Sequence, residues 1–228
     1  MLKSKKNVFW EALVVTIVIF LAGLLFGIYM ESLRSEEIDQ FYTQSEISLT
    51  DTASFASILE GDDFDCDIVK QANLDLANKV YEEAVLLEQY EESGRITDGM
   101  KLLHRKYDLL RTIMWTSNQN FLERCENYDL VVYLYEYETE EVNAKATQSV
   151  WSKILRDLKN EMSDDLLLIP IAADQNLTSL DLLMEKYDVS SFPAVVVNNE
   201  EVLYELDNVD QIKNLIDEGT NFEEIVLA

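Results

Sequence analysis

An uncharged apolar run near the N-terminus constrains the fold more than any other feature of the sequence. It extends from Ala12 to Met30 and would form a helix of about 28 Å, close to the hydrocarbon thickness of a bilayer. A secretory signal peptide would have a shorter apolar core and a small-x-small cleavage site. Residues 28–33 (IYMESL) contain no such site. The run therefore predicts an uncleaved transmembrane anchor.

The charges on either side of this run predict its orientation. Residues 1–11 contain three lysines, whereas acidic residues such as Glu31 follow the run. The positive-inside rule then places residues 1–11 in the cytoplasm and everything after residue 30 outside. We expect a single-pass plasma-membrane protein whose remaining domains are extracytoplasmic.

Gly23 and Gly27 form a small-xxx-small pair within the predicted anchor. Such a pair lets two helices approach closely and would support a homodimer through the membrane. Glycine is also simply common in membrane helices, so both interpretations stay open.

Composition excludes some classes of function. The formal net charge of -26 repels phosphate backbones, so no nucleic-acid partner is expected. The acidic run at 62–67 resembles a calcium loop, but Ile68 and Leu74 occupy the positions that need Gly and Glu. The single histidine, His104, has no second His or Cys one helical turn away. We therefore predict neither a metal nor a cofactor.

Residues 31–126 are predicted to be helical. Residues 31–61 form a stalk, in which Thr50 or Asp51 caps a short helix that ends at Gly61. Residues 62–126 carry apolar positions at three- and four-residue spacing, interrupted at Ser93-Gly94. Two such helices joined by a short turn run antiparallel.

This hairpin brings the two cysteines of the chain together. Cys66 begins the first helix and Cys125 ends the second, at similar distances from the Gly94 turn. Antiparallel helices return Cys125 to the level of Cys66, and an extracytoplasmic location permits a disulfide. We predict a structural Cys66–Cys125 bond, because neither cysteine has the close partner that a catalytic pair has.

Residues 128–220 predict an α/β domain, followed by a tail at 221–228. Two continuous apolar strands are joined by a helix with Thr139 as its N-cap, and Pro170 in the second strand suits a position where no N–H is needed. Asn198-Asn199 tolerates the positive φ of a hairpin turn. The predicted elements are the strand Leu130–Tyr135, the helix Val142–Met162, the strand Leu166–Ala172, a helix around Leu180–Tyr187, a strand after Pro193, the strand Val202–Leu206 and a helix from Val209.

This order, with Phe192-Pro193 before the third strand, resembles the thioredoxin fold with a mixed four-stranded sheet. The whole layout also looks like that of archaeal membrane-anchored, extracytoplasmic thioredoxin-like proteins. The resemblance implies that Phe192, next to a proline that is cis in the family, offers its main chain to an extended peptide. Packing of Phe192 in the core, with Pro193 shaping the turn, is the alternative.

The segment where redox-active family members carry C-x-x-C is here Tyr137–Asn143, and it contains no cysteine. Disulfide exchange requires a thiolate, so we expect a redox-inactive module that binds a protein or peptide partner. Two other functions stay open: a redox enzyme with a lone reactive cysteine, and a structural component of an envelope complex. Asn176 begins an N-glycosylation sequon in a predicted loop.

Overall fold

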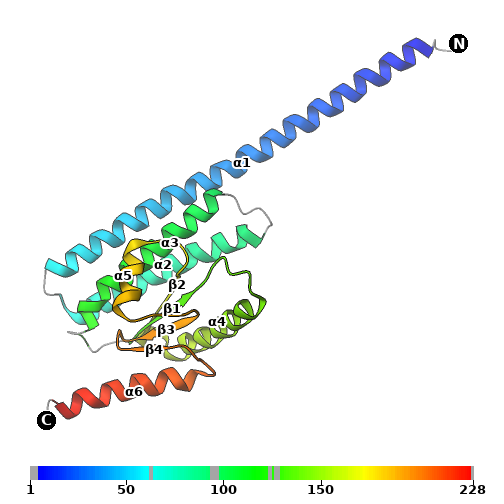
Figure 1. Cartoon of the computed structure of the whole chain (residues 1–228). Coiled ribbons are helices and arrows are strands. Elements are labelled where there is room, and N and C mark those ends of the chain that lie inside the picture. Colours follow the sequence, from blue (N-terminus) through cyan, green and yellow to red (C-terminus); the bar gives the residue numbers. More distant parts are fainter. Residues whose placement is uncertain (1–4, 62–63, 93–97, 123–124, 126–128, 227–228) are drawn as a thin grey trace. The chain divides into compact units, whose positions relative to one another are not determined.

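The computed structural model describes residues 5–61, 64–92, 98–122, 125 and 129–226. The chain divides into two compact units, Met1–Glu46 and Ile47–Ala228. Helix α1 (Lys5–Gly61) extends through the boundary between them, and all other elements belong to the second unit (Figure 1).

The apolar part of α1 agrees in length and composition with a membrane span. Within the described residues, the stretch Phe9–Ser32 has a mean hydropathy of 2.7 and is long enough to cross a bilayer. Large apolar side chains such as Phe20 and Leu25 are exposed by 67% and 65%. A signal sequence near an N-terminus can meet the same criteria of length and composition, so the uncleaved anchor and its orientation stay predictions.

Helix α1 does not restart at Thr50 or Asp51, so the predicted N-cap there is wrong. The helix continues to Gly61 without a break, because the sequence between Met30 and Gly61 contains no Pro or Gly. The Thr52 hydroxyl forms a hydrogen bond within the helix instead of capping a new one. Thr52 Oγ1 donates to the Ser48 carbonyl at 2.7 Å, a contact that helices tolerate at little cost.

Helices α2 (Cys66–Glu92) and α3 (Asp98–Leu122) form the hairpin, and its predicted turn at Ser93-Gly94 lies outside the described residues. The Cys66–Cys125 disulfide is present, with a Cα–Cα distance of 5.7 Å. Polar side chains also join the helices. Asn118 Nδ2 donates to Asn73 Oδ1 at 3.0 Å, and Tyr107 OH donates to Glu83 Oε2 at 3.2 Å.

A mixed four-stranded sheet forms the centre of the second unit, as the order of predicted elements indicated. Its strands are arranged in the order β2-β1-β3-β4. Strands β1 and β2 are parallel, whereas β3 is antiparallel to both β1 and β4. The sheet therefore has β2 at one edge, where Pro170 costs no ladder bond. The strands are β1 (Asp129–Tyr135), β2 (Leu166–Ala172), β3 (Ala194–Val197) and β4 (Glu201–Leu203).

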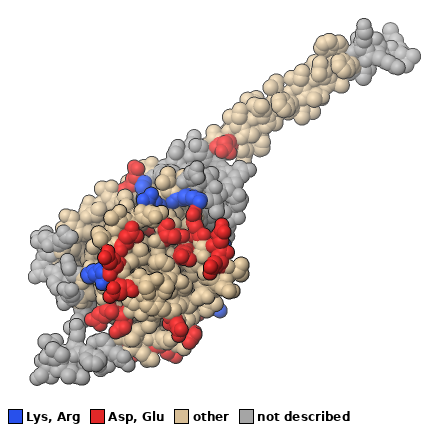
Figure 2. All heavy atoms as spheres, viewed as in Figure 1, with Lys and Arg blue, Asp and Glu red and all other residues tan. Residues whose placement is uncertain are grey.

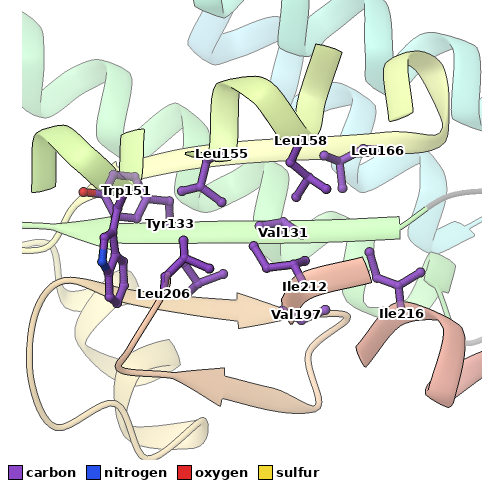
Figure 3. Close-up of a cluster of buried hydrophobic side chains, with 11 residues drawn as sticks. Val131, Tyr133, Trp151, Leu155, Leu158, Leu166, Val197, Leu206, Ile212 and Ile216 are labelled. Atoms are coloured by element: carbon purple, nitrogen blue, oxygen red, sulfur yellow. The ribbon is translucent and has the colours of Figure 1, made fainter. Parts of the chain in front are cut away.

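Helices α4 (Val142–Met162) and α6 (Val209–Val226) cover one face of this sheet. Alternate residues of a strand point to the same face, and Val131 and Tyr133 of β1 point toward these helices. Figure 3 shows them packed between Leu155 and Leu158 of α4 and the apolar side chains of α6. A short 3-10 turn, η1 (Ser163–Asp165), leads from α4 into β2.

Helices α3 and α5 (Thr178–Lys186) contact each other beside the opposite face of the sheet (Figure 1). Trp115 of α3 is fully buried there. Its Nε1 donates to Asn199 Oδ1 at 2.8 Å, and its ring stacks on Tyr187 with centroids 5.3 Å apart. Trp115 thus connects the helical hairpin to the β3–β4 turn, where Asn198 and Asn199 have φ of 48° and 61°.

Three further sequence expectations need correction. Helix α4 begins after Glu141 rather than Thr139, and no side-chain hydrogen bond caps it among the described residues. Strand β4 ends at Leu203, before the expected Leu206, which is buried in the α4–α6 core outside the strand. The expected tail at 221–228 is helical as far as Val226, because its sequence contains no helix-breaking Gly or Pro after Gly219.

Candidate functional site

The Phe192-Pro193 loop lies at the carboxyl end of β1. Ala194, the first residue of β3, pairs with Leu134 near the end of β1, which places Pro193 beside the start of the β1–α4 loop. The Phe192–Pro193 peptide bond is cis. Both side chains are half-buried and the preceding Ser191 is exposed, so the loop is neither core nor fully solvated.

Side chains from distant segments fix the β1–α4 loop. The Asp174 carboxylate, in the β2–α5 loop, accepts the main-chain N–H of Tyr137 at 3.0 Å and that of Glu138 at 2.7 Å. Gln148 Oε1 of α4 accepts the N–H of Glu136 at 2.9 Å. These three bonds fix the first residues of the loop in which a C-x-x-C pair would lie, and they explain why α4 begins later than Thr139.

The side chain of Tyr204 fixes the segment that precedes Phe192. Tyr204 OH accepts the Ser190 N–H at 3.0 Å and donates to the Asp188 carbonyl at 2.9 Å. In the part of the chain that the structure describes, the main-chain N–H and C=O of Phe192 make no hydrogen bond. A rigid loop therefore presents one donor and one acceptor that have no described protein partner.

The remaining predicted site residues lie elsewhere. Cys125 is 5% exposed and bonded to Cys66, so both cysteines of the chain are engaged. Asn176 is exposed, with φ of 53°, and its carbonyl accepts a hydrogen bond from Arg105 Nη2 at 2.9 Å. An added Cβ on Gly23 or Gly27 would meet nothing within 4 Å.

A cleft along the outer edge of β2 is a feature that the sequence did not predict. It has a volume of 830 Å³ and lies between α2 and α4, with residues of β1, β2 and α3 also in its wall. Tyrosines contribute much of the lining: Tyr81, Tyr133, Tyr135 and Tyr137. Tyr133 and Tyr135 stack with centroids 5.4 Å apart, and Tyr137 lies against the His104 ring at 4.3 Å.

The described lining of this cleft is positively charged, whereas the chain as a whole is strongly acidic. Acidic side chains are abundant on the face drawn in Figure 2, and the chain has 44 Asp and Glu against 18 Lys and Arg. Among the described residues that line the cleft, none is Asp or Glu, whereas four are cations: Arg111, Lys153, Arg156 and Lys159.

Burial shifts the pKa of several groups in this wall. It raises the pKa of Tyr133 to about 12 and raises that of Tyr135, helped by the nearby charge of Asp108. Burial lowers the pKa of Lys159, although Asp164 and Asp165 oppose the shift. Both tyrosines thus stay protonated and uncharged at neutral pH, and the Tyr133 hydroxyl donates to the Gln148 carbonyl at 3.2 Å.

Two sequence patterns mark side chains of the cleft wall, although neither pattern brings them together around one space. Tyr133, Tyr135 and Tyr137 alternate and therefore share one face of the strand and its extension. Lys153, Arg156 and Lys159 recur every three residues and share one face of a helix. Asp174, which fixes the β1–α4 loop, gives no signal of this kind because its contacts are long-range.

Comparisons with known proteins add a weak likeness. No protein-family model and no curated protein matched the chain. Among solved structures, thioredoxin O2 from Arabidopsis thaliana in its oxidised state matched with a TM-score of 0.32 and 16% identity. The match covers 47% of this chain and 87% of the thioredoxin chain.

Proposed function

We propose that this protein is a membrane-anchored binding module whose thioredoxin-like domain lies outside the cell and captures an extended peptide without exchanging disulfides. One observation carries the proposal: the two cysteines of the chain are bonded to each other. The β1–α4 loop, where a dithiol would be needed, contains no cysteine. Without a thiolate, no disulfide can be attacked there.

The order of strands and helices supports the thioredoxin-like domain. The peptide would contact the main chain of Phe192, whose N–H and C=O have no described partner. An extended segment that pairs with such groups gains main-chain hydrogen bonds, as in strand addition. The fixed Tyr204 contacts to Ser190 and Asp188 support this site, because a rigid loop loses little entropy on binding.

Site-specific photocrosslinking of the full chain in native membranes tests this. A photoreactive residue at the exposed Ser191 should crosslink a peptide segment, whereas one at the exposed Ser179 of α5 should not. Partner binding should also slow hydrogen exchange of the Phe192 amide by at least tenfold. Equal crosslinking at both positions, or an unchanged Phe192 amide, would reject this site.

The anchor and its orientation are supported by the apolar stretch Phe9–Ser32 and by the lysines before it. We expect the mature protein to keep its N-terminal peptide in mass spectrometry and to resist carbonate extraction. Protease added to intact cells should digest the second unit. A secreted form that begins after residue 30 would identify a cleaved signal sequence instead.

Gly23 and Gly27 support a homodimer through the anchor, because the space beside each is open in the single chain. Gly27→Ile should then reduce crosslinked dimer in membranes, and Leu24→Ile, which leaves the pair intact, serves as the control. Dimer unchanged by Gly27→Ile would rule out this pair as the contact.

A further inference from the structure

We propose that the cleft between α2 and α4 binds a small organic anion that carries a ring. Its volume of 830 Å³ lies within the range of small-molecule sites, about 300–1,000 Å³. The cleft is separate from the Phe192 loop, so this inference does not depend on the peptide-binding proposal.

Arg111 carries the argument for an anion. Its side chain is 8% exposed and lines the cleft. Among the described contacts its Nη1 donates to Asp108 Oδ1 at 3.2 Å, and a guanidinium has about five N–H donors in all. The remaining donors are therefore available to a carboxylate or phosphate, which arginine binds in a bidentate manner.

Three cations of α4 add positive charge to the cleft wall. Lys153 and Arg156 are exposed at the cleft wall. Lys159 Nζ is held by the carbonyls of Ser163 and Leu166, so its charge stays fixed in place. Asp108 offsets Arg111, and Asp164 and Asp165 lie near Lys159, whereas neither Lys153 nor Arg156 forms an ion pair among the described residues.

The tyrosines indicate a ring on the ligand. Tyr135 and Tyr137 are half-buried, Tyr135 stacks on the buried Tyr133 and Tyr137 lies against His104, so the wall offers aromatic surfaces that are already ordered. Aromatic pairs in offset or edge contact gain roughly 0.5–1.5 kcal/mol beyond burial. A ring between these side chains would place an attached anion toward the cations of α4.

The edge of β2 argues against a peptide strand in this cleft. Alternate residues of an edge strand turn their main-chain groups outward. Here the Leu166 carbonyl accepts from Lys159 Nζ and the Ala172 N–H donates to Asp108 Oδ1. Pro170 between them has no N–H. Three of these outward groups are thus capped or missing, which disfavours strand addition along β2.

Calorimetric titration of the full chain in nonionic detergent tests the proposal with phenyl phosphate as the probe. Phenyl phosphate should bind with one-to-one stoichiometry, more tightly than either inorganic phosphate or phenol, and more weakly as salt is raised. The Lys153→Ser/Arg156→Ser variant should lose at least tenfold in affinity. Lys145→Ser, at an exposed position of the same helix that does not line the cleft, should change it less than twofold.

The proposal would be overturned by the absence of saturable phenyl phosphate binding, or by equal affinity in the wild type and the double variant. Equal binding of inorganic phosphate and phenyl phosphate would overturn the role of the tyrosines. Because the substituted side chains are exposed, the far-ultraviolet circular dichroism of the variants should match that of the wild type.

Discussion

Asp108 and Arg111 of α3 form a buried ion pair that joins the helical hairpin to the sheet. Arg111 Nη1 lies 3.2 Å from Asp108 Oδ1, and the side chains are 8% and 0% exposed. The same carboxylate oxygen accepts the main-chain N–H of Ala172, at the end of β2, at 3.1 Å. Burial raises the pKa of Asp108, and the charge of Arg111 opposes that shift.

Removing one member of this pair should cost more stability than removing both. Asp108→Leu leaves the Arg111 charge buried and the Ala172 N–H without its acceptor, so we expect a loss of about 3–5 kcal/mol. Asp108→Leu/Arg111→Leu should lose less, because no unpaired charge remains. Urea unfolding of the full chain in detergent, followed by tryptophan fluorescence, measures both. A larger loss in the double variant would contradict this account.

Asp129 should make the stability of the second unit depend on pH. Burial raises its pKa above the usual 3.8, with Asp165 and Asp217 adding to the shift, whereas Asn198 and Lys70 oppose it. The folded chain therefore binds this proton more tightly than the unfolded chain. The resulting stability is present below the unfolded pKa and is lost as pH rises through the folded pKa.

Asp129→Asn removes this titration, since the amide stays neutral. Relative to the wild type, the variant should therefore become more stable as the pH is raised from 4 to 7. Unfolding free energies at both pH values provide the measurement, and Asp157→Asn, at an exposed position of α4, is the matched control for loss of one charge. A difference between variant and wild type that is the same at both pH values would exclude this role of Asp129.

The strands and long helices were predictable because their signals are local. The strand Leu166–Ala172 and the helix Val142–Met162 have the bounds expected from the sequence, since each is a continuous or periodic apolar segment. The cap at Thr139 was wrong because the loop before α4 is held by Asp174, which is distant in sequence. Helix propensity depends on local sequence, so it does not account for a contact between two loops that are distant in sequence.

The Phe192-Pro193 loop and the cleft also differ in how far local sequence patterns indicate them. Phe192-Pro193 could be singled out because a proline before an apolar strand is a local pattern. The cleft could not, because its walls come from α2 and α4 and from Arg111 of α3. The sequence contains the alternating tyrosines and the spaced cations of α4, but the tertiary arrangement is needed to place them around one space.

The Cys66–Cys125 bond should contribute stability rather than redox activity. It joins residues 59 apart in sequence, for which loop-closure entropy gives about 4 kcal/mol. Cys66→Ser/Cys125→Ser should lower the unfolding free energy by an amount of this order, and the non-reduced wild type should take up no alkylating reagent. Ready alkylation of Cys125 without reductant would instead favour a thiol enzyme.

Asn198 should be the most sensitive residue of the β3–β4 turn. Its φ is 48°, its Oδ1 accepts the Leu130 N–H at 2.7 Å, and its Nδ2 donates to Asp129 Oδ1 at 2.8 Å. Asn198→Ala loses both bonds and keeps a Cβ at positive φ, so we expect a loss of about 2–3 kcal/mol.

Asn198→Gly separates these two causes, because glycine adopts the same φ without a steric cost. It should lose roughly 1 kcal/mol less than Asn198→Ala, while Glu200→Ala, at an exposed position of the same turn, should stay within about 0.5 kcal/mol of the wild type. Denaturant unfolding of the three variants measures this. Equal losses for Ala and Gly would show that the bonds to Leu130 and Asp129 account for the whole effect and that the backbone conformation adds nothing.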